Sequence, residues 1–196
     1  MITPLRKVGI AIALLFGLLF ASSSYLQVIA AEDIADDDRN VRKLYESFSA
    51  ERGQILAGGI PIAESVPVDS QFSFLRTYPY AELYAPVVGY YTLTQGNAGI
   101  ESALNPLLTG RADSQVIEQL RALVTGSTPQ GASVMLSLDP EIQQLAWDAL
   151  GNNKGSVVVM EPQTGRILAM VSKPSYDPNL LAAHSSSAVL ESYLEL

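Results

Sequence analysis

Few side chains in this sequence have a type and spacing that could do chemistry. There is no cysteine, and the single histidine, His184, is followed directly by three serines. A serine and a histidine form a hydrolytic pair only when the fold orients both, and adjacency in sequence does not achieve this. We therefore interpret His184 as a solvated loop residue. The absence of cysteine excludes zinc fingers, iron–sulfur clusters, disulfide scaffolds and cysteine nucleophiles.

The acidic residues offer no catalytic pair either. Asp36 and Asp37 lie in a polar run without the apolar surroundings that would make one carboxyl an acid and the other a base. Because Arg6 and Lys7 contribute +2 to a formal net charge of −8, the rest of the chain carries −10. Such a surface argues against nucleic-acid binding, which requires basic patches. We expect no cofactor and no bound metal.

The elements that would have to position a site are clearest near the C-terminus. Residues 155–161 and 166–171 are apolar runs rich in β-branched side chains, and Pro162 to Gly165 has the composition of a turn. We predict a β-hairpin with Gly165 in a left-handed conformation. The apolar residues do not alternate with polar ones, so both faces of the hairpin should be covered, as in a sheet between helical layers.

A strand and a helix are predicted just before this hairpin. Residues 134–138 alternate in the manner of a strand, and Asp139 is a good N-cap for a helix that Gly151 ends. The helical spacing predicts the apolar face of this helix to be Ile142, Leu145, Ala146, Ala149 and Leu150. The order strand, helix, hairpin indicates an α/β layered domain that begins near Ala132.

The middle of the chain predicts a small mixed α/β module. Gly58-Gly59 between apolar runs predicts a hairpin, and Pro61 confines its strand to an edge or a bulge. Aromatic residues are dense in residues 74–91; stacking on sugars or on a partner is an alternative, but we favour packing of the module's core. A helix is predicted over residues 114–124, capped by Asp113, and a further amphipathic helix from Ser186 with Val189, Leu190, Tyr193 and Leu194 as its apolar face.

The N-terminus reads as an export signal. Residues 8–31 carry no charge, and as a helix they would be about 36 Å long, enough to cross a bilayer. Arg6 and Lys7 would hold the N-terminus in the cytoplasm, and the remainder would be exported. We favour a retained anchor, because the apolar character continues past Ser22 and Ser23. A signal peptide cleaved near these serines, or near Ala30 and Ala31, stays an alternative.

Several motifs, in this order, resemble the N-terminal part of a class B penicillin-binding protein. That family consists of membrane-anchored peptidoglycan D,D-transpeptidases, and the likeness is greatest to its short actinobacterial type. The matching stretches are ERGQI at 51–55, FLRTYP at 74–79, LYAP at 83–86, GYY at 89–91, GIE at 99–101, LDPEIQQ at 138–144, GSVVVMEPQTGRILAM at 155–170 and PSYDPN at 174–179.

The resemblance implies an α+β protein in four parts. These are a cytoplasmic tip with a transmembrane signal-anchor (1–31), an acidic spacer (32–47), a non-catalytic, dimerisation-like pedestal (48–131) and the incomplete start of the transpeptidase domain (132–196). In the family, the Arg-Gly and Gly-Ile-Glu motifs knit the pedestal to the catalytic domain. On that pattern Arg52, Gly53, Gly99 and Glu101 are the structural residues between domains, with an ion pair from Arg52 to Glu101.

The motifs that would carry the family's chemistry are absent. Its members need Ser-x-x-Lys, Ser-x-Asn and Lys-Thr-Gly, with the lysine one helical turn after the nucleophilic serine. None of the three occurs: the residues three positions before Lys7, Lys43, Lys154 and Lys173 are Pro4, Asn40, Gly151 and Met170. No catalytic residue is assigned, and serine acyl transfer is not expected of this chain alone.

Two functions follow as hypotheses. In the first, the chain is the membrane-anchored front of a penicillin-binding protein at the cell membrane, with peptidoglycan and β-lactams as ligands of a full-length form. In the second, residues 1–131 are a non-enzymatic, membrane-tethered pedestal that binds proteins of cell-wall elongation or division. A secreted version of that pedestal, after signal cleavage, is a third.

Overall fold

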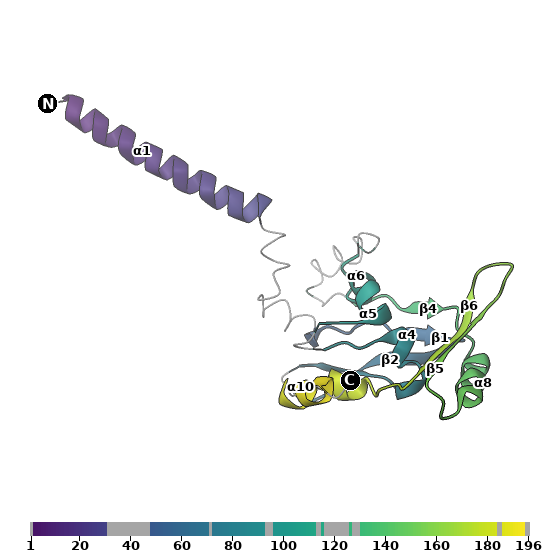
Figure 1. The fold of residues 1–196 in the computed structure, drawn as a ribbon. Coiled ribbons are helices and arrows are strands. Elements are labelled where there is room, and N and C mark those ends of the chain that lie inside the picture. The colour runs from purple at the N-terminus through teal and green to yellow at the C-terminus, as the bar shows by residue number, and fades with distance from the viewer. Residues whose placement is uncertain are drawn as a thin grey trace. The chain divides into compact units, whose positions relative to one another are not determined.

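The computed structural model describes residues 2–30, 48–70, 72–92, 96–112, 115, 126, 130–183 and 186–194 (Figure 1). The chain divides into two compact units, Met1–Leu44 and Tyr45–Leu196. The predicted helix at 114–124, the acidic spacer at 32–47 and His184 lie outside the described residues, apart from Gln115.

The described residues of the first unit, 2–30, form one long helix. Helix α1 (Ile2–Ser24) continues into a π-helical turn, η1 (Tyr25–Ile29), and the apolar side chains from Val8 to Ile29 are exposed. Within the described residues a single stretch, Arg6–Ile29, is long and apolar enough to cross a membrane, judged by length and composition. The predicted charge-free helix is therefore present.

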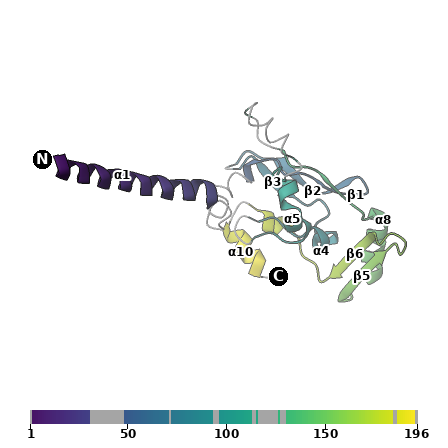
Figure 2. The ribbon, with the colours of Figure 1, turned by 90° about the horizontal axis from the view of Figure 1, so that it is seen from above.

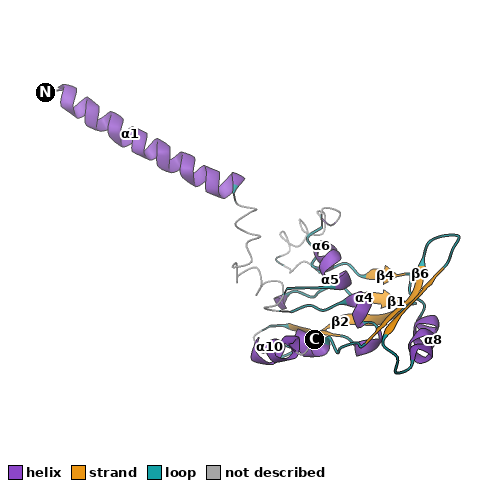
Figure 3. Ribbon diagram, in the orientation of Figure 1, coloured by secondary structure: helices purple, strands orange, loops and turns teal. Residues whose placement is uncertain are grey.

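The second unit contains two sheets (Figure 3). The four-stranded sheet has the order β3-β2-β1-β4, with β1 at Ile55–Ala57, β2 at Ile60–Pro67, β3 at Phe74–Thr77 and β4 at Val134–Leu136. Strands β1, β2 and β3 are antiparallel neighbours, whereas β4 pairs in parallel with β1. The first three residues of the strand predicted at 134–138 therefore pair with β1, while Ser137 donates to the Ile167 carbonyl of the C-terminal hairpin at 2.7 Å.

The β1–β2 hairpin has the predicted turn. Gly58 and Gly59 have φ angles of 55° and 86°, values that suit glycine and a two-residue turn. The register shifts between Ile55, which pairs with Ala63, and Leu56, which pairs with Pro61. The bulge thus accommodates Pro61 in a strand that has neighbours on both sides, which is one of the two placements that the sequence allowed.

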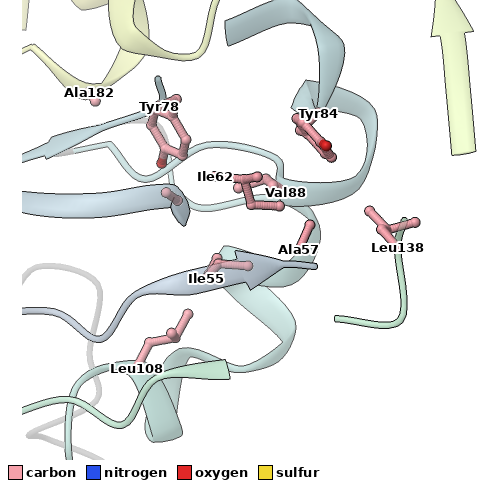
Figure 4. Packing of buried hydrophobic residues seen from close by; sticks show 10 residues of the cluster. Ile55, Ala57, Ile62, Tyr78, Tyr84, Val88, Leu108, Leu138 and Ala182 are labelled. Carbon is pink, nitrogen blue, oxygen red and sulfur yellow. The ribbon is translucent and has the colours of Figure 1, made fainter. Parts of the chain in front are cut away.

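Short helices cover this sheet and complete its core: η2 (Ala81–Leu83), α4 (Ala85–Val88), α5 (Gly99–Ala103) and α6 (Asn105–Leu108). The buried side chains converge in Figure 4, where Tyr78 and Tyr84 pack with Ile62 and Val88, as expected of an aromatic-rich core. Leu138 and Ala182, from the C-terminal part of the chain, belong to the same core cluster. The two parts of this unit therefore share one hydrophobic core.

Helix α8 (Pro140–Leu150) has the predicted ends. The Asp139 carboxylate accepts hydrogen bonds from the backbone N–H groups of Glu141 and Ile142, at 2.9 and 3.1 Å, and Gly151 follows the last turn with φ 54°. The predicted apolar face was wrong at Leu145, which is 69% exposed, and at Ala149, which is also exposed. Gln143 is fully buried instead, because its amide satisfies main-chain groups of two neighbouring elements.

The second sheet is the predicted hairpin of β5 (Gly155–Met160) and β6 (Ile167–Lys173), and α8 packs on it (Figure 2). Ala146 of α8 packs with Ala169 and Val171. On the opposite face, Val158 and Met160 are more than half exposed. The described residues therefore supply one of the two covering layers that the all-apolar strands predict.

The chain continues through α9 (Asn179–Ala182) into α10 (Ser186–Leu194), the predicted final helix. Of its predicted apolar face, Val189 is fully buried, whereas Leu190, Tyr193 and Leu194 are 46%, 36% and 77% exposed.

Lys173 caps the C-terminal end of α8. Its Nζ donates to the carbonyl oxygens of Gly151 at 2.6 Å and Trp147 at 3.1 Å, and lies 3.9 Å from the centroid of the Trp147 ring. A cation at a partly buried helix C-terminus stabilises by up to about 2 kcal/mol. We expect Lys173→Met to lower the free energy of unfolding in urea by about 1–2 kcal/mol. The matched change at the exposed Lys154 should cost less than about 0.5 kcal/mol, and equal losses would contradict the capping role of Lys173.

Candidate functional site

The most distinctive side chains of the second unit form a buried ionic cluster, made of Arg52, Arg76 and Glu101. The Nε atoms of Arg52 and Arg76 lie 2.6 and 2.7 Å from the two carboxylate oxygens of Glu101. The exposed fraction of these side chains is 2% for each arginine and 0% for the glutamate. One carboxylate therefore bridges two guanidinium groups inside the protein.

Three elements bring these residues together. Arg52 lies just before β1, Arg76 lies on β3, and Glu101 is in the first turn of α5. Arg52 also donates to the side-chain oxygen of Asn105 at 2.8 Å and to the Glu101 carbonyl at 2.7 Å, and Arg76 donates to the Gly53 carbonyl at 2.9 Å. The cluster thus ties the start of the sheet, its edge strand and the helical cover to one another.

The cluster carries a formal charge of +1, because two arginines face one glutamate. The Arg52 guanidinium carbon lies 4.2 Å from the centroid of the Tyr91 ring, which adds a cation–π contact. Nη2 of Arg76 is buried and makes no hydrogen bond to any residue that the structure describes. Because an unpaired buried charge costs several kcal/mol, Glu101 is the group on which the stability of both arginines depends.

Tyr78 directly follows β3, and its side chain also contacts Glu101. Its hydroxyl lies 3.4 Å from Oε1 of Glu101, and its side chain is buried. Burial, together with the negative charge of Glu101, raises the pKa of Tyr78 well above its usual value of 10.0. The hydroxyl is therefore neutral wherever the protein is folded at ordinary pH.

This raised pKa predicts a loss of stability in alkali. The folded state holds the Tyr78 proton more tightly than the unfolded chain, so the free energy of unfolding is unaffected below the unfolded pKa of about 10 and falls as the pH rises above it. Tyr176, whose pKa is raised to about 12 chiefly by burial, acts in the same direction. Urea unfolding from about pH 8 to about pH 11 measures the effect. The decline should be shallower in Tyr78→Phe, and stability that rises over this range would contradict the assignment.

Close backbone crossings at four glycines support the cluster. A Cβ atom on Gly53 would lie 2.0 Å from the Ala132 carbonyl oxygen, and one on Gly131 would lie 1.8 Å from that of Leu108. In a second crossing, a Cβ atom on Gly89 would lie 2.1 Å from the Ala98 carbonyl oxygen, and one on Gly99 would lie 2.7 Å from the Gly89 nitrogen. These positions admit only glycine because backbone atoms, which cannot rotate away, occupy the space.

The structure brings together the four residues singled out in the sequence. Arg52 and Glu101 form the ion pair, while Gly53 and Gly99 each stand at one of the backbone crossings. Sequence reasoning missed Arg76, Tyr78 and Asn105. The spacing of Arg76 and Tyr78 was an available signal. Residues two positions apart in a strand lie on the same face, and both of these residues are buried.

The cluster has no catalytic chemistry of its own, since its groups are engaged with one another and hold no nucleophile. Among the residues that the structure describes, no three histidine, cysteine or acidic side chains gather closely enough to hold a metal ion. The arrangement is suited to fixing the pedestal's shape.

Two family models match separate stretches of the second unit. The family model described as the penicillin binding protein A dimerisation domain matches residues 52–134, and that of the penicillin binding protein transpeptidase domain matches residues 155–193. The whole ionic cluster lies within the first match.

Curated relatives and solved structures match in the same way. Peptidoglycan D,D-transpeptidase PbpA of Mycolicibacterium smegmatis is 44% identical over 99% of this chain and 40% of the relative, and that of Mycobacterium tuberculosis H37Rv is 42% identical over 98% and 40%. The structure of penicillin-binding protein A from M. tuberculosis as an imipenem acyl-enzyme complex has a TM-score of 0.74 at 43% identity, covering 78% of this chain and 36% of that one.

The fold, the ionic cluster and these likenesses define the class: the chain belongs to the class B penicillin-binding proteins and corresponds to their N-terminal part. Within that class it is similar to penicillin-binding protein A. It spans about two fifths of the length of the curated relatives that it matches, 40% in each case.

Proposed function

We propose that the whole protein cross-links peptidoglycan stem peptides by serine acyl transfer, and that this chain supplies its anchor, its pedestal and the first elements of its catalytic domain. The observation that carries the proposal is the collinear match to PbpA over nearly the entire chain. Relatives solved as β-lactam acyl-enzyme complexes support β-lactams as ligands of the full-length form. The chemistry itself would come from a further part of the whole protein, because the three required motifs are absent from this sequence.

The proposed parts are the signal-anchor at 1–31, the spacer at 32–47, the pedestal at 48–131 and the start of the transpeptidase domain at 132–196. Because β4 pairs in parallel with β1, residues 134–136 of the proposed second domain would extend the pedestal sheet. In this scheme the ionic cluster, together with Gly53 and Gly99, holds the pedestal in the shape that the second domain needs.

We propose a single-pass membrane protein with the N-terminus in the cytoplasm. Its support is the uncharged helix after Arg6 and Lys7, which by the positive-inside rule would stay on the cytoplasmic side. The lipid bilayer would contact residues 8–31. Everything after Glu32 would then lie where peptidoglycan is built.

A second function would apply if the gene encodes no catalytic domain. Residues 1–131 would then act as a membrane-tethered module that binds cell-wall elongation or division proteins, and the support is the match of the dimerisation-domain model to residues 52–134. Reading the DNA beyond codon 196 in all three forward frames separates the two functions. The transpeptidase proposal predicts Ser-x-x-Lys, Ser-x-Asn and Lys-Thr-Gly in that order, and their absence from every frame would favour the module.

A further inference from the structure

One main-chain segment, Tyr78–Tyr84, receives side chains from three separate parts of the C-terminal region. Asn179, at the start of α9, accepts a hydrogen bond from the Tyr78 N–H at 2.8 Å and donates one to the Tyr78 carbonyl at 3.0 Å. The amide thus binds both main-chain groups of one residue, as a neighbouring strand would. Ser175 donates to the Glu82 carbonyl at 2.7 Å.

Gln143 of α8 makes the most extensive of these contacts. Its Nε2 donates to the Leu83 carbonyl at 2.8 Å and to the Met170 carbonyl at 3.0 Å, and its Oε1 accepts from the Met170 N–H at 2.8 Å. The side chain is fully buried. One glutamine therefore connects α8, β6 and the Tyr78–Tyr84 segment, and every polar atom of its amide is used.

The same segment leads directly into the ionic cluster. Tyr78 places its hydroxyl near Glu101, while its main chain is held by Asn179. In Figure 4 Tyr78 lies beside Ala182 of α9 in the shared core. Polar contacts thus connect Arg52 through Glu101 and Tyr78 to Asn179 of α9. At the other end of the segment, Gln143 binds the Leu83 carbonyl and connects it to Met170 of β6.

We propose that Gln143, Ser175 and Asn179, the joint residues, fix the orientation of the C-terminal elements on the pedestal by holding the Tyr78–Tyr84 segment to α8, β6 and α9. All three bind main-chain groups, so they hold the course of the backbone whichever side chains the segment carries. Hydrogen bonds impose direction and distance, whereas the apolar contacts at Leu138 and Ala182 tolerate sliding. Partly buried carbonyls left without donors would be costly, which favours the arrangement seen in the structure.

The Arg-Gly and Gly-Ile-Glu motifs would then affect the second domain indirectly, through the pedestal. The cluster shapes the pedestal, and the Tyr78–Tyr84 segment carries that shape to the second domain. Any consequence for transpeptidation rests on the function proposed above. The joint itself can be tested on this chain without any penicillin-binding measurement.

Hydrogen–deuterium exchange of the full chain in detergent micelles provides the test. Gln143→Met keeps the length of the side chain but removes all its hydrogen bonds. We expect amide exchange to accelerate at least tenfold both at residues 78–84 and at Met170, with β1 and β2 unchanged. Gln144→Met is the matched control, since Gln144 is exposed and its amide donates to the Asp148 carboxylate of the same helix, at 2.9 Å. It should leave both regions unchanged.

Two further variants keep the proposal falsifiable if Gln143→Met fails to fold. Gln143→Glu retains an acceptor for the Met170 N–H but loses the donor to Leu83, so residues 78–84 should lose protection while Met170 keeps it. Ser175→Ala removes one contact and should accelerate exchange at residues 78–84 by a smaller factor. Acceleration confined to α8 and β6, equal acceleration across the whole second unit, or no change in any variant would overturn the proposal.

Discussion

Replacing Glu101 with glutamine is expected to lower the free energy of unfolding by about 3–5 kcal/mol, the loss typical when one partner of a buried ion pair is removed. The carboxylate is fully buried and accepts from Nε of both Arg52 and Arg76. Its neutralisation would leave two buried cations without a counter-charge. Urea unfolding followed by circular dichroism on the chain in micelles measures the loss.

The controls for Glu101 separate burial from charge. Glu141→Gln removes an exposed carboxylate from the first turn of α8 and should cost less than about 1 kcal/mol. Arg52→Met leaves Glu101 paired with Arg76 and should cost less than Glu101→Gln, because the remaining charges balance. A Glu101→Gln protein that unfolds at the same urea concentration as the unchanged protein would contradict the stabilising role of the cluster.

Replacing Gly53 with alanine should destabilise the protein about as much as Glu101→Gln does. The Cβ atom would lie 2.0 Å from the Ala132 carbonyl oxygen and 2.5 Å from its carbon, and relief would require β4 to move away from β1. Overpacking usually costs about 1–3 kcal/mol, and a clash with backbone should reach or exceed that range. We expect Gly53→Ala to lower the unfolding free energy by at least about 3 kcal/mol.

Gly165→Ala is the matched control for that experiment. Gly165 has φ 74° but open space around its Cβ position, so alanine there costs only the left-handed backbone term of about 1–2 kcal/mol. At Gly53 the steric term operates instead. If the two substitutions were equally destabilising, the close approach between residues 53 and 132 would not be the reason for the glycine.

Helix ends and tight turns could be predicted from the sequence because neighbouring residues determine them. Asp139, Gly151, Gly59 and Gly165 act within a few residues of themselves, through a cap or a positive φ, and each stands where the pattern placed it. The error at Leu145 has the opposite origin. Helical spacing ranks faces by hydrophobicity alone, and it cannot anticipate that Gln143 finds three main-chain partners in distant segments.

The cluster shows the same limit. The pairing of Arg52 with Glu101 came from the family resemblance, since the two residues are 49 positions apart and no periodicity connects them. Arg76 and Asn105 add hydrogen bonds to that pair. They reach it because the fold brings β3 and α6 close to α5, which the sequence alone does not show. The partner of β4 was unpredictable for this reason as well, because a parallel pairing depends on a long-range crossover.

Labelling with a fluorescent penicillin tests the central claim most directly. Membranes containing the 21.0 kDa chain would be compared with membranes containing the product of the whole gene. We expect a covalent label on the longer product, at a serine one helical turn before a lysine, and none on the chain itself. A label on the 21.0 kDa chain, or none on either protein, would contradict the proposed function.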